Sequence, residues 1–176
     1  MPIGDAALDG ARAEVKAWLR LETENEDAIV DALIRSAIGH GEGFTGRALI
    51  VREEVQRLPA SREWQRLTMT PVSAITSVMG IPADGAGFLL PVERYAVDID
   101  GNGDGWVRLI EPGAAGRIDV THMAGMAADW ASLPDAIRQG AVRLAAHMFA
   151  QRDGDGGAPP AAVSALWQPW RRMRIG

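Results

Sequence analysis

Hydrophobic residues near both ends of the chain recur every three or four positions, which is the spacing of one face of an α-helix. Two such segments precede residue 47 and two follow residue 125, so we predict four helices. The predicted inward residues are Leu8, Ala11, Val15, Trp18 and Leu19 in the first helix, Ile29, Leu33, Ala37 and Phe44 in the second, Ile137, Ala141, Leu144 and Met148 in the third, and Val163, Leu166 and Trp167 in the fourth.

Local signals predict where the helices begin and end. Thr23 with Glu26 matches a capping box at the start of the second helix, and Ser132 ahead of Pro134 is typical of the start of the third. Gly46 is a natural end for the second helix, because glycine accepts the left-handed conformation. Pro169 must stop or kink the fourth helix, since it lacks a backbone N–H.

Between the helical pairs, polar and apolar residues alternate instead, as they do in half-buried β-strands. Pairs of turn residues such as Asn102-Gly103 separate the alternating runs, as hairpin connections do. Pro71 confines its run to a sheet edge or a strand start. The predicted one-sided sets are Tyr95, Val97 and Ile99 in one strand and Ile118, Val120 and His122 in another.

The order of these elements predicts an α+β fold: a small helical bundle, built from two N-terminal and two C-terminal helices, with an inserted antiparallel β-subdomain. We expect the N-terminal helical pair at 1–46 and the inserted β-subdomain at 47–125. The C-terminal helical pair that completes the bundle is expected at 126–168, and a basic aromatic tail at 169–176.

Composition narrows the classes of function. The chain has 176 residues, of which 47% are hydrophobic and 23% charged, and its net charge is −5. An acidic chain is a poor general binder of nucleic acid or anionic membranes. The absence of cysteine excludes disulfides and thiolate metal sites. The acidic start "MPIGDAALDG" lacks the features of a signal peptide, and no apolar stretch approaches the roughly 20 residues that span a bilayer, so no membrane is expected.

The stretch "DIDGNGDG" begins like a helix–loop–helix calcium site, with acidic or amide side chains at alternate positions. The candidate ligands are Asp98, Asp100, Asn102 and Asp104. The twelfth position, where that motif has a bidentate glutamate, is Leu109, and the flanks alternate like strands. A hairpin turn rich in glycine and aspartate therefore accounts for the stretch better, and a calcium-binding interaction module is the alternative.

No other motif points to catalysis. "GEGFTG" matches a dinucleotide fingerprint by letter, but a helix precedes it and a strand follows, the reverse of the order that a pyrophosphate site needs. The three histidines are isolated in the sequence, and neither a nucleophile elbow nor a P-loop occurs. We expect no catalytic residues, no cofactor and no bound metal.

The C-terminus combines tryptophan, arginine and methionine, residue types that are enriched at protein interfaces. The candidate docking residues are Trp167, Trp170, Arg171, Arg172, Met173, Arg174 and Ile175. Two interpretations remain: the tail folds back on its own bundle, or it docks on a partner. We expect docking, with the chain beyond Pro169 free to leave the bundle.

Several stretches together resemble the head–tail connector, or adaptor, proteins of long-tailed bacteriophages. They run through nearly the whole chain, and their order is more specific than any one of them. The stretches are "EVKAWLRLETENEDAIVDALIRSAIGHGEGFTGRALI", "MTPVSAITSV", "RYAVD", "GRIDVTHMAG", "LPDAIRQGAVRLAAHMFAQRD" and "AVSALWQPWRR". The Ala-, Gly- and Arg-rich composition suits an alphaproteobacterial host, and such hosts make gene transfer agents, phage-like particles with an adaptor of this type. The chain departs from the phage pattern in its "DIDGNGDG" hairpin and its Trp-rich tail.

This resemblance implies a structural virion protein of the particle neck, assembled in the bacterial cytoplasm. Such adaptors form a ring, expected to be dodecameric, beneath the portal protein, and they continue the DNA channel toward a stopper or tail-completion protein. The C-terminal segment typically docks on the portal. DNA passes through without sequence-specific binding, which suits an acidic chain because the DNA must slide.

Overall fold

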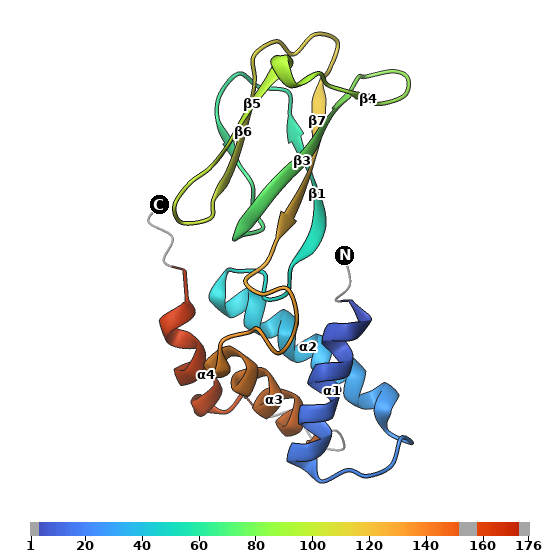
Figure 1. Ribbon diagram of the computed structural model, residues 1–176, viewed down its shortest axis with the longest axis vertical. Helices are drawn as coiled ribbons and strands as arrows, with labels where there is room; N and C mark the ends of the chain where they lie inside the picture. Colours follow the sequence, from blue (N-terminus) through green and yellow to red (C-terminus); the bar gives the residue numbers. More distant parts are fainter. Residues whose placement is uncertain (1–3, 152–157, 173–176) are drawn as a thin grey trace. The chain divides into compact units, whose positions relative to one another are not determined.

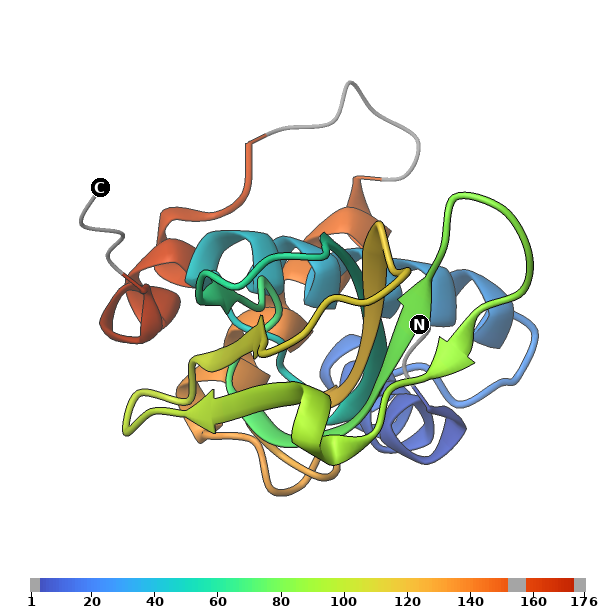
Figure 2. The same cartoon turned by 90° about the horizontal axis from the view of Figure 1, so that it is seen from above.

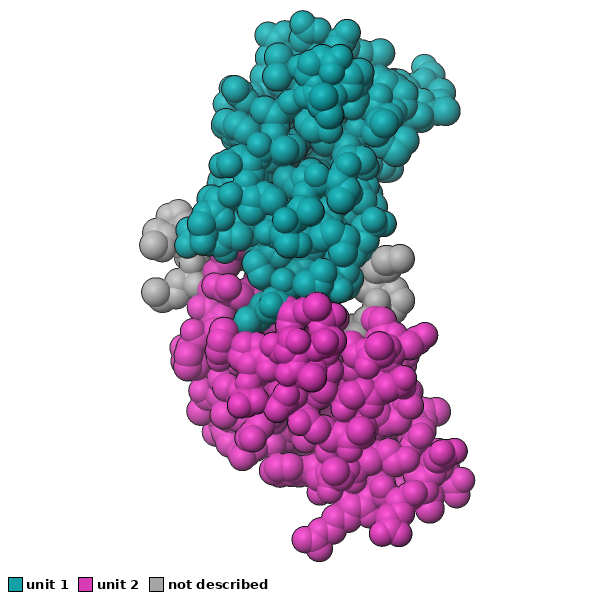
Figure 3. All heavy atoms as spheres, in the orientation of Figure 1, with its two compact units in different colours: residues 1, 51–126 teal, residues 2–50, 127–176 magenta. Residues whose placement is uncertain are grey.

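A computed structural model describes residues 4–151 and 158–172 of the chain. The chain divides into two compact units, one of residues 51–126 and one of residues 2–50 and 127–176 (Figure 3). The first unit contains the strands and the second the α-helices, so the predicted α+β class is confirmed. We call them the β unit and the helical unit.

Over its described residues, the helical unit contains four α-helices and one 3₁₀ helix (Figure 1). They are α1 (Asp5–Leu19), α2 (Asp27–Thr45), α3 (Asp135–Ala150), α4 (Ala161–Trp167) and η2 (Gln168–Trp170). Helix α3 packs against the three other α-helices, and α1 also packs against α2. In the part of the chain that the structure describes, no helix is both long and apolar enough to cross a bilayer.

The buried helical faces agree with the sequence pattern in part. Leu8, Ala11 and Val15 of α1 are buried as predicted, but Trp18 is 55% exposed. In α2 the buried face is shifted by one residue, so Ile29 is 46% exposed. The buried residues of α2 are Val30, Ile34, Ala37, Ile38, Gly41 and Thr45. The shift is possible because α2 has apolar residues at neighbouring positions, so two adjacent faces of the helix are apolar. Packing against the other helices determines which of the two faces is buried.

The helix ends differ more from the predictions. The capping box is absent: Glu26 occupies the N-cap position of α2 without a side-chain cap hydrogen bond. The N-cap residue of α3 is Pro134, without a side-chain cap hydrogen bond, and Ser132 lies in the preceding turn, where its N–H donates to the carboxylate of Asp129. Gly46 does end α2, with φ at 69° in the left-handed region, as its lack of a side chain predicts.

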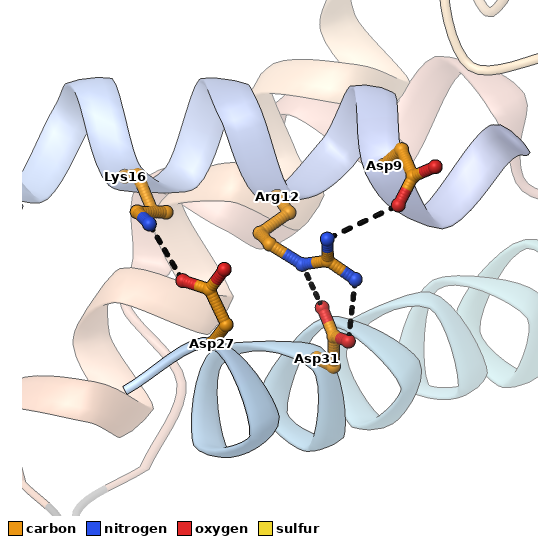
Figure 4. Close-up of polar contacts among 5 residues, drawn as sticks. All are labelled: Asp9, Arg12, Lys16, Asp27 and Asp31. Carbon is orange, nitrogen blue, oxygen red and sulfur yellow. Dashed lines mark hydrogen bonds and ion pairs between the residues drawn. The ribbon is translucent and has the colours of Figure 1, made fainter. Parts of the chain in front are cut away.

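Ion pairs join α1 to α2 (Figure 4). The Arg12 guanidinium donates to both carboxylate oxygens of Asp31 at 2.6 Å, and it also lies 3.1 Å from Asp9. The hydrogen bond to Asp31 holds the pKa of Arg12 above its ordinary value. The Lys16 ammonium lies 2.6 Å from Asp27. These ion pairs form only when α1 and α2 lie in one particular alignment, so they favour that alignment over others.

The β unit consists of two antiparallel sheets, seen from two directions in Figures 1 and 2. One has the order β1-β7-β3-β4 and the other the order β2-β6-β5. The strands are β1 (Arg52–Pro59), β2 (Gln65–Arg66), β3 (Val72–Ile81), β4 (Phe88–Leu89), β5 (Tyr95–Ile99), β6 (Gly105–Leu109) and β7 (Arg117–Ala124), and the 3₁₀ helix η1 (Val92–Arg94) precedes β5.

The sheets share one hydrophobic core. Its buried residues are Leu67, Val72, Val78, Leu90, Val107, Leu109, Ile118 and Val120. The prediction that Ile118, Val120 and His122 share the inner face of one strand is confirmed, since all three are buried. The prediction for β5 is wrong beyond Tyr95: Val97 is 42% exposed and Ile99 38% exposed, because β5 is an edge strand that the core does not cover along its length.

Candidate functional site

Trp167, the first of the predicted docking residues, lies in the core of the helical unit. Its side chain is 3% exposed, and the indole N–H donates to the carbonyl oxygen of Ile137 at 3.1 Å. A Cβ atom on Gly140 of α3 would lie 2.2 Å from the indole nitrogen, so this position has no room for a side chain. Trp167 therefore anchors α4 to α3, and its nearly buried ring also lines a hollow between α2 and α4.

Residues 169–172 remain on the bundle, contrary to our expectation that the chain leaves it at Pro169. It lies within η2, whose 3₁₀ turn continues directly from α4. The N–H of Arg171 donates to the Gln168 carbonyl at 3.2 Å, and the N–H of Arg172 donates to the carbonyl of Thr45 at 2.8 Å. Pro169 fits at the start of the 3₁₀ turn, because a backbone N–H in that position would have no partner within the turn. The hydrogen bond from Arg172 then holds this part of the chain on the end of α2. Met173, Arg174 and Ile175 lie outside the described residues.

Arg171 and Arg172 contact the C-terminal end of α2, and the short helix η2 that precedes them follows directly on α4 (Figures 1 and 2). The Arg171 guanidinium lies 5.7 Å from the centre of the Phe44 ring, within cation–π range, and Arg171 is exposed. Arg172 and Trp170 are half-buried. Positive side chains are favoured here because the last carbonyls of α2 carry partial negative charge. We call Phe44, Trp170, Arg171 and Arg172 the C-terminal docking surface.

Two adjoining hollows meet at this surface. One, of about 790 Å³, is bounded by the end of α2 and by Gln168, Pro169, Arg171 and Arg172. The other, of about 530 Å³, is a groove with apolar walls that runs between α2 and α4. Phe44 and Gly43 line both hollows. The arrangement can receive a side chain or short segment with an apolar part and a negative or hydrogen-bond-accepting part.

Sequence reasoning missed the groove along α2. Its floor includes Gly39 and Gly43, and a Cβ atom at either position would meet nothing within 4 Å. Neither glycine is required by packing inside the chain, although each costs helix stability. The glycines of "GHGEGFTG" were the available signal, but we considered only a helix end and a dinucleotide fingerprint there.

The "DIDGNGDG" stretch forms the turn between β5 and β6. The Asp100 carboxylate accepts the N–H groups of Asn102 at 2.8 Å and Asp104 at 3.0 Å, and also the indole N–H of Trp106 at 3.3 Å. The turn closes through Asp100 N–H to the Asp104 carbonyl at 3.0 Å. Asp100 therefore uses its oxygens to fold the turn.

The other acidic residues of this turn point to the same interpretation. Asp104 is 5% exposed and lies 3.7 Å from the Arg66 guanidinium, whereas Asp98 is exposed on β5. Over residues 4–151 and 158–172, no group of three or more His, Cys, Asp or Glu side chains is placed to hold a metal ion. The geometry favours the hairpin turn over the calcium-binding alternative.

Solved structures that resemble the chain come from gene transfer agent (GTA) particles. The neck of an empty GTA particle, computed with C6 symmetry, contains a chain of 29% sequence identity and TM-score 0.78, and the match covers 99% of this chain and 96% of that one. The virion of a native GTA particle gives 28% identity, TM-score 0.74, and coverage of 99% and 94%. The neck of a native GTA particle, computed with C12 symmetry, gives 27% identity, TM-score 0.72, and coverage of 99% and 96%.

These likenesses extend over the whole chain. No protein-family model matches the sequence, and no curated protein matches it significantly. The likeness to GTA neck chains confirms the resemblance predicted from the order of the sequence stretches. It also supports a structural virion protein and not an enzyme.

Proposed function

We propose that this chain, similar over its whole length to neck chains of GTA particles, is the head–tail adaptor of such a particle. Copies of it form a ring beneath the portal protein and link the DNA-filled head to the stopper or tail-completion protein. The observation that carries the proposal is the match of both units to chains from necks computed with C6 and C12 symmetry. A ring of twelve copies is compatible with both symmetries.

The C-terminal docking surface is the part that contacts the portal in this proposal. It offers one exposed guanidinium beside a hollow of about 790 Å³. It also offers the adjoining groove, where α2 exposes glycines that leave room for a partner's backbone. Each contact of this kind is weak, but a ring repeats it once per copy, so the summed contact becomes strong.

The acidic character of the chain fits a protein that surrounds moving DNA. Its net charge of −5 gives no general attraction for phosphates. Contacts to phosphates would retard DNA as it leaves the head, whereas a weakly repelling wall lets it slide. The ring therefore continues the DNA channel without reading the sequence of the DNA, and the particle is assembled in the cytoplasm before release.

Deletion of the gene in a cell that makes the particles tests this function. The expected result is DNA-filled heads without tails in electron micrographs, because the joint between the two parts is missing. Complementation with the intact gene should restore tailed particles. Tailed particles at the normal yield in the deletion strain would contradict the proposal.

A further inference from the structure

The β unit carries a run of exposed apolar residues that its own fold does not explain. The run is "FLLPV", residues 88–92, and of these only Leu90 is buried. Leu89 is 67% exposed and Val92 is 75% exposed. Several neighbouring apolar residues left in water are uncommon on a protein that acts alone, and they mark contact surfaces.

The first residues of this run form β4, an edge strand of its sheet. The Leu90 N–H donates to the Val78 carbonyl at 2.9 Å, and Leu89 lies opposite Met79. Antiparallel pairs alternate between bonded and non-bonded residues, so the backbone N–H and C=O of Leu89 face away from β3. No other strand of the described chain pairs with that edge.

The surroundings of the run are mainly apolar. Phe88 lies over Gly80, where an added Cβ would come within 2.8 Å of the ring. A hollow of about 330 Å³ lies between the 88–94 segment and the loop 112–114. Arg94 lies 3.3 Å from Glu111, and the exposed Glu93 follows Val92 in the chain. A partner therefore meets a mainly apolar surface with charged residues at its border.

We propose that the surface formed by residues 88–92 is where one copy of the chain contacts the next copy in the ring. The inference rests on the proposed ring. A closed ring of identical subunits needs contacts between two different patches of each copy. Among the described residues the helical unit exposes only two large hydrophobic side chains, Trp18 and Ile29, while the β unit exposes nine. The apolar contact between copies therefore belongs to the β unit, and residues 88–92 are its most exposed part.

Site-specific photo-crosslinking in purified particles tests this contact. A benzophenone amino acid replaces Leu89 in one strain and Val55 in a control strain. Val55 is a fair control because it is 59% exposed, lies in the same unit and belongs to a different edge strand, β1. After irradiation, the Leu89 position should give a product at twice the 18.8 kDa mass of the chain, and mass spectrometry should find only this chain in it. The Val55 position should give at least about tenfold less of this crosslinked product, which is the change in binding expected when one anchoring residue is lost.

A pair of charge variants gives a second readout. Leu89→Lys should lower the amount of the chain in purified particles by about tenfold, because a buried charge replaces an apolar anchor. Val55→Lys should leave incorporation unchanged. Far-ultraviolet circular dichroism of both purified variants should match that of the original protein, since both positions are exposed.

Each outcome decides the matter. A crosslink from Leu89 to another neck protein, no crosslink from Leu89 in particles that contain the chain, or equal loss with both lysine variants would overturn the contact proposal and leave the adaptor function standing. Particles with normal tails that lack the chain altogether would overturn both.

Discussion

Two glycines within helices show how differently the chain uses the same residue. Gly140 of α3 faces the indole of Trp167 so closely that a methyl group would lie 2.2 Å from its nitrogen. Gly39 of α2 faces open space. The first is required by packing inside the chain, and the second leaves room for something outside it.

This difference predicts opposite effects of one substitution. Gly140→Ala should destabilise the protein by about 1–3 kcal/mol, because the indole must move and lose its hydrogen bond. Gly39→Ala should stabilise it by up to about 1 kcal/mol, because alanine favours the helix. Thermal unfolding of both variants checks this. A neutral Gly140→Ala would show that Trp167 is not fixed in the core.

His122 gives the β unit a dependence on pH. Its side chain is 1% exposed, and burial lowers the pKa of the imidazole below its ordinary value of 6.5, although a contact with the Val120 carbonyl and the charge of Glu54 oppose the shift. The folded protein therefore binds the proton less readily than the unfolded chain does. Stability from this residue is present above pH 6.5 and is lost as pH falls.

Replacing this histidine should flatten the dependence. In urea unfolding between about pH 7.5 and about pH 5.5, one unit to either side of the ordinary histidine pKa, His122→Leu should show a smaller loss of unfolding free energy on acidification. The exposed His40 supplies the control, and His40→Leu should retain the original slope. An unchanged slope in His122→Leu would mean that other groups cause the acid sensitivity.

At the scale of elements, the β5–β6 turn has more contacts than a solvent-exposed loop needs. The Gly103 carbonyl accepts the Val72 N–H at 2.8 Å, and the Gly105 carbonyl accepts the Leu67 N–H at 2.8 Å. A Cβ on Gly103 would lie 2.6 Å from Pro71. The turn therefore fixes the start of β3, and shortening it should weaken the β unit.

Asp100 is the residue on which this turn depends. Asp100→Ala removes three hydrogen bonds and should lower stability by about 1–3 kcal/mol, whereas Asp98→Ala at an exposed position should change little. Millimolar calcium should shift the melting temperature of neither variant nor of the original protein. A saturable calcium-dependent rise that Asp100→Ala abolishes would restore the calcium-binding alternative.

The sequence predicted elements better than it predicted faces or ends. Alternation found β7 because Arg117, Asp119 and Thr121 alternate with Ile118, Val120 and His122, which leaves one possible inner face. In α2, Ile29 and Val30 are both apolar, so periodicity alone could not decide which one packs inward. Thr23 and Glu26 matched a capping box, but the helix begins at Asp27, so Glu26 is the N-cap residue instead of Thr23, and it makes no side-chain cap hydrogen bond.

The candidate site shows the same limit. Composition identified the basic aromatic C-terminus, and Arg171 is exposed as a docking residue must be. Composition could not separate the buried Trp167 from the residues at the surface. Trp167 is buried because Gly140, in a helix distant in the sequence, leaves room for its indole. The proline rule did predict that α4 stops before Pro169, but it did not predict that a 3₁₀ turn keeps the chain up to Arg172 on the end of α2.

The docking surface predicts a defect in joining heads to tails. Arg171→Glu should lower the fraction of DNA-filled heads that carry tails by about tenfold, because it replaces the exposed positive charge beside the hollow. Arg35→Glu makes the same change of charge at an exposed position of α2 and should have little effect. Electron micrographs of particle preparations give the count. Equal defects would indicate a general effect of charge.

At the scale of the whole molecule, the free chain should be a monomer or a weak oligomer. The two units bury their cores separately, and the exposed apolar residues of the β unit form short runs and not one broad face. Sedimentation velocity at low micromolar concentration should therefore show mainly an 18.8 kDa species. A stable ring in the absence of portal would show that the copies do not need the portal to assemble.

The central claim is that the chain forms a ring between portal and tail. Cryo-electron microscopy of particles from the producing cell, with the neck reconstructed without imposed symmetry, tests it most directly. The account predicts twelve copies of this fold in one ring beneath the portal, with Arg171 at the portal side and residues 88–92 between neighbouring copies. A neck without this fold, or with the chain elsewhere in the particle, would contradict it.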